Sequence, residues 1–84
     1  MGLDSVEWVM LLEDEFEVPI PDGVAETFHT PRAAVEYIAP RADPSTWPRE
    51  RVERRVLEIS AEQFGRPIGE VRLDSHIVHD LGAD

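Results

Sequence analysis

The chain contains no cysteine and no lysine among its 84 residues. The missing cysteine excludes disulfide bonds, thiolate metal sites and cysteine nucleophiles, and it is typical of a cytoplasmic protein. No apolar run approaches the ~18 residues that a membrane-spanning helix needs, and no basic start followed by an apolar stretch indicates a secretion signal. No extended alternation of polar and apolar residues predicts a strand. We therefore expect an all-α fold that does not enter a membrane.

Acidic residues dominate the charge of the chain. All eight basic residues are arginine, against 18 Asp and Glu, and the net charge is −10. Residues 1–30 carry eight of the acids and no arginine, whereas residues 49–84 carry eight acids and six arginines. Such a field repels nucleic acid and anionic membrane surfaces, and it attracts a partner with a basic face. The alternative is that the acids only keep a small domain soluble.

Four helical segments are expected, two of them long. Residues 3–17 predict an amphipathic helix, because apolar side chains recur there at the spacing of one helical stripe. The predicted stripe, with acids on most of the other face, consists of Val6, Val9, Met10, Leu12 and Phe16. Trp8 falls beside this stripe, where it either contacts a partner or packs half-buried against the domain.

Capping residues predict where the other helices begin and end. Residues 22–29 allow one short turn. Thr30-Pro31 combines an N-cap with a first-position proline, so the next helix is expected from residue 31 to about residue 38. A second long helix is expected over residues 49–64, ending at Gly65 in a left-handed C-cap.

The chain is expected to be a single domain over residues 1–84. Residues 1–38 and 49–84 carry the helices, and residues 39–48 form a linker with three prolines that Trp47 pins. Residues 66–84 are expected to be a loop in which Asp74-Ser75 caps a short turn. The expected core contacts of this loop are Ile68, Val71, Leu73, Ile77, Val78 and Leu81. The core of the helices is expected to contain Val9, Met10, Leu12, Val35, Ile38, Val56 and Ile59.

Two blocks of the chain resemble the acyl carrier protein family, in reversed order. Residues 7–22, EWVMLLEDEFEVPIPD, resemble the second helix and following loop of bacterial acyl carrier proteins, and AETFHTPRAAVEYI resembles the third and fourth helices. Residues 52–84 resemble the first helix and long loop, ending at the Asp of the family's Gly-x-Asp-Ser-Leu motif. The resemblance implies a small four-helix bundle with a permuted helix order: family helices II, III and IV, then the linker, then helix I.

In that family the serine of the motif carries 4′-phosphopantetheine, whose thiol holds an acyl group. An alignment without gaps places Gly2 at the modified serine, and the attachment site is then absent. A second alignment reads Gly2-Leu3-Asp4-Ser5 as the motif, so that Ser5 is the attachment point. This second alignment needs the following helix to be about one turn shorter than in the family. Otherwise Ser5 is a capping or first-turn serine without a prosthetic group.

The resemblance implies a protein of fatty acid or polyketide biosynthesis that presents an acyl group and has no enzyme activity of its own. Its acidic helix would bind basic faces of acyl-handling enzymes or of a phosphopantetheinyl transferase. The residues implied for this docking are Asp4, Glu7, Glu13, Asp14, Glu15 and Glu17. The alternative is a pseudo-carrier adaptor, which keeps the fold and the acidic face but lacks the prosthetic group. A third hypothesis is a self-associating structural module.

No other catalytic or metal-binding pattern is present. The chain has no Ser-His-Asp set with a supporting motif, no Gly-rich phosphate loop and no paired carboxylates within an apolar run, so an enzyme is not expected. His76 and His79 lie three residues apart near Asp74 and Asp80, a spacing that can support a metal on a helix. Because no third convergent ligand is visible, surface histidines are expected and no metal site is predicted.

The reversed order of the halves permits two assemblies with the same contacts. A linker of this length can reach roughly 30 Å when extended, so one chain can close on itself as a monomer. The halves can also pair between chains, which gives a domain-swapped homodimer. A third possibility is that the chain is a piece of a tandem array of carrier domains.

Overall fold

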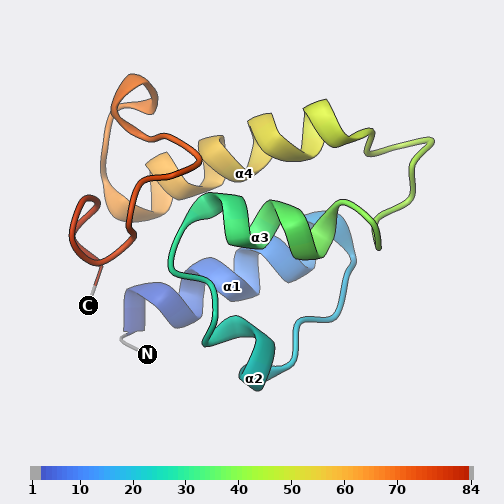
Figure 1. Ribbon diagram of the computed structural model, residues 1–84, viewed down its shortest axis with the longest axis horizontal. Helices are drawn as coiled ribbons and strands as arrows, with labels where there is room; N and C mark the ends of the chain where they lie inside the picture. Colours follow the sequence, from blue (N-terminus) through green and yellow to red (C-terminus); the bar gives the residue numbers. More distant parts are fainter. Residues whose placement is uncertain (1–2, 84) are drawn as a thin grey trace.

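The computed structural model describes residues 3–83, with side chains from Asp4 onward, and over this range the secondary structure is entirely helical. The elements are α1 (Leu3–Phe16), α2 (Asp22–Ala25), α3 (Pro31–Ile38), α4 (Arg49–Phe64) and the 3₁₀ turn η1 (Ile68–Glu70) (Figure 1). The radius of gyration is 11.5 Å, close to the ~12 Å expected for one compact domain of this length. The prediction of a small all-α domain is confirmed. No helix within residues 3–83 is long and apolar enough to cross a membrane.

The helix ends lie close to where the capping residues predict them. The Thr30 hydroxyl accepts a hydrogen bond from the backbone N–H of Ala33 at 3.2 Å, at the start of α3. At the other end of α4, Gly65 adopts φ 65°. The N–H groups of Gly65 and Arg66 donate to the carbonyls of Glu62 and Ala61, which is the double hydrogen bond of a Schellman cap. Local chemistry therefore sets these boundaries.

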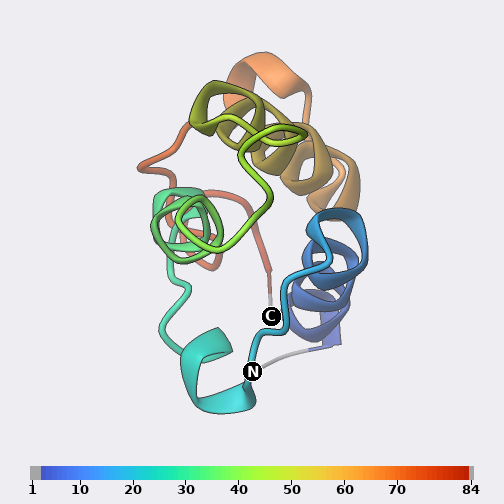
Figure 2. The same ribbon diagram turned by 90° about the vertical axis from the view of Figure 1, so that its right-hand side faces the viewer.

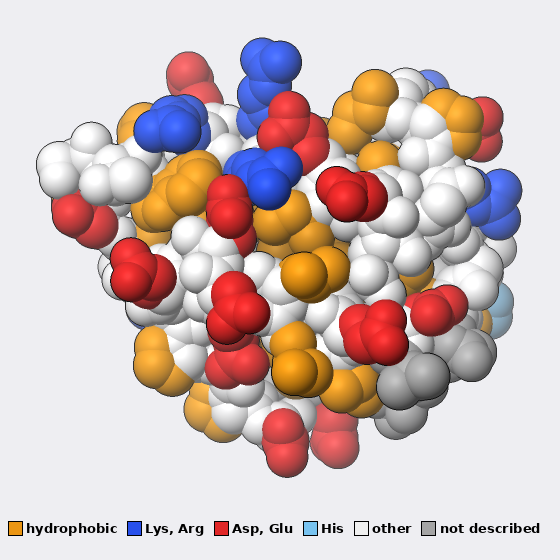
Figure 3. Space-filling model, turned by 180° about the vertical axis from the view of Figure 1, so that it is seen from behind, with side chains coloured by type: hydrophobic (Ala, Val, Ile, Leu, Met, Phe, Trp, Pro, Cys, Tyr) orange, Lys and Arg blue, Asp and Glu red, His pale blue; other side chains and the backbone are white. Residues whose placement is uncertain are grey.

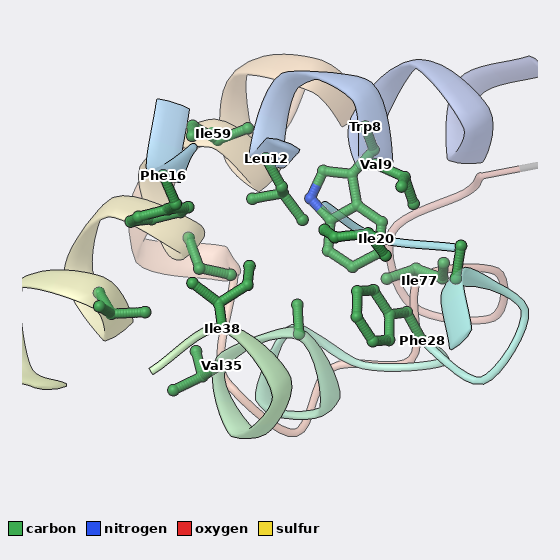
Figure 4. Packing of buried hydrophobic residues seen from close by; sticks show 14 of the residues in the cluster. Trp8, Val9, Leu12, Phe16, Ile20, Phe28, Val35, Ile38, Ile59 and Ile77 are labelled. Carbon is green, nitrogen blue, oxygen red and sulfur yellow. The ribbon is translucent and has the colours of Figure 1, made fainter. Parts of the chain in front are cut away.

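Helix α4 lies antiparallel to both α1 and α3 and packs against both (Figures 1 and 2). The buried side chains of the three helices form one cluster, which includes Phe16, Val35 and Ile59. Trp8 is fully buried in this cluster and lies beside Phe28, with ring centroids 6.2 Å apart (Figure 4). Its ring also lies 5.6 Å from that of Phe64. The front and back portions of the chain thus share a single core.

The buried face of α1 differs from the predicted stripe. Val6 is 40% exposed and Met10 is 57% exposed, so the prediction that both face inward is wrong. The prediction that Trp8 contacts a partner or packs only half-buried is also wrong, since the side chain is 0% exposed. Two apolar stripes compete on this helix, and the one with the larger side chain is buried because it removes more apolar surface from water. The residues that face the core are Ser5, Trp8, Val9, Leu12 and Phe16.

A buried hydrogen bond fixes α1 against α4. The indole Nε1 of Trp8 donates to the Ser60 hydroxyl at 2.9 Å, and that hydroxyl donates to the Val56 carbonyl at 2.6 Å. Each buried polar group therefore has a partner, which a fully enclosed indole N–H and hydroxyl require. Among the side chains that the structure describes, no buried polar atom is left without one.

The linker between α3 and α4 is an ordered turn rather than a long tether. The Asp43 carboxylate accepts hydrogen bonds from the hydroxyl and the N–H of Ser45, and these bonds lower the pKa of Asp43. Trp47 packs edge-on against Phe16, with ring centroids 4.6 Å apart, as predicted for a pinned linker. Glu36 and Arg49 form an ion pair at 2.6 Å across the two helix ends. The ends joined by the linker therefore lie side by side.

Replacing Trp47 with alanine is expected to lower the free energy of unfolding by about 1–3 kcal/mol, through lost apolar burial and the lost ring pair. Pro44→Ala, in the exposed part of the same linker, is the matched control and is expected to change stability much less. Urea unfolding followed by far-UV circular dichroism measures both. Equal losses for the two variants would show that the ring does not pin the linker.

The segment after α4 packs on the bundle through part of the predicted set. Val71, Ile77 and Leu81 are buried, whereas Ile68 and Val78 are 53% and 45% exposed, so their predicted core positions are wrong. Ile68 begins η1 and Val78 lies in a surface turn, where helix packing does not reach them. The segment is therefore held on the core by Val71, Ile77 and Leu81, while Ile68 and Val78 stay at the surface.

The predicted cap at Asp74-Ser75 is also wrong. Asp74 instead binds Arg32 of α3 at 2.7 Å, and the Ser75 hydroxyl accepts from the backbone N–H of Arg72. The turn begins one residue later, where the Nδ1 atom of His76 accepts hydrogen bonds from the N–H groups of Val78 and His79. An imidazole nitrogen thus takes the capping role that the sequence predicts for a serine or an aspartate.

The Arg32–Asp74 pair is expected to give a small dependence of stability on pH. The hydrogen bond and charge of Arg32 lower the pKa of the Asp74 carboxyl in the folded state. A lowered folded-state pKa contributes stability above the unfolded value of about 3.9 and loses it as the pH falls through the folded value. Asp74→Asn should therefore be less stable than the wild type at pH 7 and equal to it at strongly acidic pH. Thermal unfolding at both pH values measures this, and a difference that persists in acid would rule the pair out as its cause.

Candidate functional site: the outward face of helix α1

Ser5, the candidate attachment residue, lies in the first turn of α1 on the side that faces the core. Only 3% of its surface is exposed. It precedes Trp8 and Leu12 by three and seven residues, so the three side chains share one helical face. A transferase must bring phosphopantetheine to an exposed hydroxyl, and the folded domain does not present this one. Gly2, which the alignment without gaps places at the modified serine, lies outside the described residues.

The opposite side of α1 carries apolar side chains that the described domain leaves about half exposed. Val6, Met10 and Leu11 are 40%, 57% and 44% exposed. Glu7 and Asp14, three residues before and four residues after Met10, lie on the same outward side and are exposed too. From behind, where α1 lies in front of α3, hydrophobic side chains are seen among Asp and Glu side chains (Figure 3). We call the surface of these five residues the α1 face.

The six acids predicted to dock a partner divide into two groups. Glu13 and Glu15 make contacts within the domain. Glu13 accepts a hydrogen bond from the N–H of Ile20 at 2.7 Å, and Glu15 forms an ion pair with Arg55 of α4 at 2.7 Å. The bond to Glu15 raises the pKa of Arg55. Such contacts occupy these carboxylates, so they are less available to a partner.

Three of the other four predicted acids are exposed. Asp14 and Glu17 are exposed, and Asp4 is half-buried. Glu7 is exposed and accepts one hydrogen bond from Gln63 Nε2 at 3.2 Å, while the same nitrogen donates to the backbone carbonyl of Asp4. Glu17 adopts φ 54° where α1 ends, a left-handed conformation that directs the chain toward Pro19. Glu7 and Asp14 are therefore the predicted acids that the helix brings beside exposed apolar surface.

A hollow of about 230 Å³ lies between α1 and α4, at the edge of the α1 face. Its lining comes from both helices and consists of Leu11, Asp14, Glu15, Arg55, Ile59 and Glu62. This volume is below the ~300–1,000 Å³ of most small-molecule sites.

The histidines come together in a way that the sequence does not show. His29 stacks on His76 with ring centroids 5.8 Å apart, and His79 lies 4.4 Å from His76. The Ile77 N–H donates to the His29 carbonyl, so the stack lies where the last segment joins the α2–α3 loop. No group of side chains within the described range could hold a metal ion. In this structure the stacked rings join the two segments, and His76 Nδ1 caps the turn that follows it.

Comparison with known proteins adds no assignment: no family model matches the chain, and no solved structure matches it. The features of the chain that bear on its function are therefore the α1 face, the burial of Ser5 and the sequence resemblance to carrier domains.

Proposed function

We propose that this protein is a pseudo-carrier adaptor: an acyl-carrier-like domain with permuted helix order that binds basic-faced acyl-handling enzymes without a prosthetic group. In this proposal α1, α2 and α3 correspond to the family's helices II, III and IV, and α4 corresponds to helix I. The protein has no catalytic role of its own. It acts by occupying or positioning an enzyme that recognises carrier domains.

The arrangement of the helix ends supports the permuted order. The Glu36–Arg49 ion pair at 2.6 Å shows that the end of α3 and the start of α4 are neighbours. A carrier domain in the usual order would have its two termini at these positions, where a short linker can join them. The linker 39–48 does so without separating α4 from the core, since Val52 and Val56 are fully buried.

The burial of Ser5 is the observation that favours an adaptor over a working carrier. A serine that is 3% exposed inside a helix does not fit the attachment of a phosphopantetheine arm. Modification of Ser5 would require the first turn of α1 to leave the core. The other alignment, with Gly2 at the serine position, offers no hydroxyl at all. Both alignments of this region therefore support a domain without the group.

The chemistry of the α1 face indicates the kind of partner. Its centre is the half-exposed, unbranched side chain of Met10, which can adapt to an apolar socket. Glu7 and Asp14 border it and would meet Arg or Lys around that socket. Ion pairs at an exposed rim contribute little affinity but raise the association rate and fix the orientation. Most of the binding energy is then expected from the apolar centre.

Titration calorimetry with a broad-specificity phosphopantetheinyl transferase tests the proposed docking. Met10→Ser is expected to weaken binding about tenfold, since about 1–1.5 kcal/mol of apolar burial is lost. Val78→Ser is the matched control, because Val78 is similarly exposed but lies in the last segment. In stopped-flow association kinetics, Glu7→Gln combined with Asp14→Asn should reduce the association rate and its dependence on salt. Equal effects of Met10→Ser and Val78→Ser would refute docking through the α1 face.

A further inference from the structure

A second apolar surface lies between α4 and the segment that follows it. The hollow there has a volume of about 510 Å³ and is lined by Glu50, Glu53, Arg54, Leu57, Glu58, Ile68 and Leu73. Leu57 and Leu73 are half-buried and form its floor, while Ile68 stands 53% exposed at the start of η1. We call this hollow the α4 groove. It shares no residue with the α1 face, and η1, which carries Ile68, lies beyond the end of α4 (Figure 1).

Carboxylates dominate the rim of the α4 groove, with three glutamates against one arginine. Glu53 is paired with Arg49 at 3.2 Å, but that guanidinium also binds Glu36 at 2.6 Å. Glu58 is paired with two arginines, Arg54 at 3.5 Å and Arg55 at 3.4 Å. Among residues 3–83, none forms an ion pair with Glu50. Within that range, Glu50 is therefore the rim carboxylate that keeps an unpaired negative charge, in the same hollow as the exposed side chain of Ile68.

We propose that the α4 groove binds a short basic amphipathic helix, with apolar residues one turn apart and Lys or Arg beside them. The lining residues from Glu50 to Glu58 extend along α4 for about 12 Å, which is the length of two helical turns. Apolar side chains of such a helix would cover Ile68 and Leu73. Its cations would meet the glutamates of the rim, particularly Glu50. Nucleic acids and anionic membranes would be repelled by the same carboxylates.

Charge complementarity distinguishes this partner from an uncharged apolar one. Acidic residues bordering an apolar centre raise the cost of docking a partner that leaves them desolvated and unpaired. A basic helix satisfies the same carboxylates while it covers the apolar floor, in the way that amphipathic helices bind hydrophobic grooves. The inference does not depend on the proposed function, because a different helix face and different side chains carry it.

A defined peptide tests the α4 groove on the full-length chain. The probe is an end-capped peptide of three to four turns, with leucines in one helical stripe and lysines on both flanks. Its dissociation constant is measured by titration calorimetry, and its contact surface by amide chemical shift changes. Ile68→Ser is expected to raise the dissociation constant about tenfold. Val78→Ser, an equally exposed position outside the groove, is expected to leave it within about twofold.

A control peptide and further variants show whether charge contributes to binding and whether the peptide binds in the α4 groove. A peptide with glutamates in place of the lysines should not bind, and Glu50→Gln should weaken binding of the basic peptide more at low salt than at high salt. Unchanged binding to Ile68→Ser would overturn the proposal. Loss of binding in Met10→Ser alone would also overturn it, by placing the peptide on the α1 face. That outcome would leave the proposed function of the α1 face standing.

Discussion

Replacing Trp8 with alanine is expected to lower the free energy of unfolding by about 3–5 kcal/mol, the range found when a large buried aromatic side chain is removed. The indole is 0% exposed and lies where α1, α4 and the α2–α3 loop meet. For a domain of this size the loss is a large part of the total stability. Urea unfolding followed by far-UV circular dichroism measures it, since Trp47 complicates a fluorescence signal.

Two matched variants separate the contribution of apolar burial from that of the hydrogen bond between Trp8 and Ser60. Trp8→Phe keeps much of the apolar volume but removes the donor to Ser60, and Ser60→Ala removes the acceptor and leaves the indole N–H unpaired. Each is expected to cost about 1–3 kcal/mol. The double variant should cost less than the sum, because the single variants break the same bond. A Trp8→Ala variant as stable as the wild type would place the indole on the surface and contradict the shared core.

The helix boundaries follow from the sequence because short-range chemistry fixes them. Thr30-Pro31 and Gly65 satisfy the free backbone groups of α3 and α4 with atoms a few residues away. Such signals do not depend on the rest of the fold. The linker is similar, since Pro48 precedes α4 and Asp43 forms its turn with Ser45.

The rotation of α1 about its axis could not be predicted in the same way. Val6 and Met10 form one apolar stripe, Trp8 and Leu12 form another, and Val9 and Phe16 belong to both. Periodicity alone does not choose between the stripes. The choice is made by α4, whose Ser60 hydroxyl pairs with the indole and whose buried residues leave room for the large ring. A tryptophan that adjoins an apolar stripe and a serine within the opposite helix are the signals that could have revealed it.

The same rotation determines the candidate site. With Trp8 inside, Ser5 turns inward and the apolar pair Val6 and Met10 turns outward between exposed acids. The sequence predicted the acidic character of the helix but not the apolar centre of its outward face. It also could not assign Glu13 and Glu15 to contacts within the domain, because their partners, Ile20 and Arg55, are brought to them only by the folded chain.

A rearranged chain offers the clearest test of the permuted-carrier proposal. It places residues 49–84 first, then one serine in place of Gly2, then residues 3–38. The join reads Gly82-Ala83-Asp84-Ser-Leu3, so the family's motif is complete and its serine precedes α1 rather than lying inside it. The contacts among α1, α3 and α4 are kept, since the new ends at residues 38 and 49 lie side by side. Removal of the linker takes away buried Ala42 and the packing of Trp47 on Phe16, so the rearranged chain is expected to be less stable than the natural one.

Intact mass spectrometry after incubation with coenzyme A and a broad-specificity phosphopantetheinyl transferase provides the measurement. We expect the rearranged chain to gain the mass of one phosphopantetheine group, and the same chain with alanine at the new serine to gain nothing. The natural chain is expected to keep its mass. A gain on the natural chain that Ser5→Ala abolishes, or a rearranged chain that folds yet stays unmodified, would contradict the proposal.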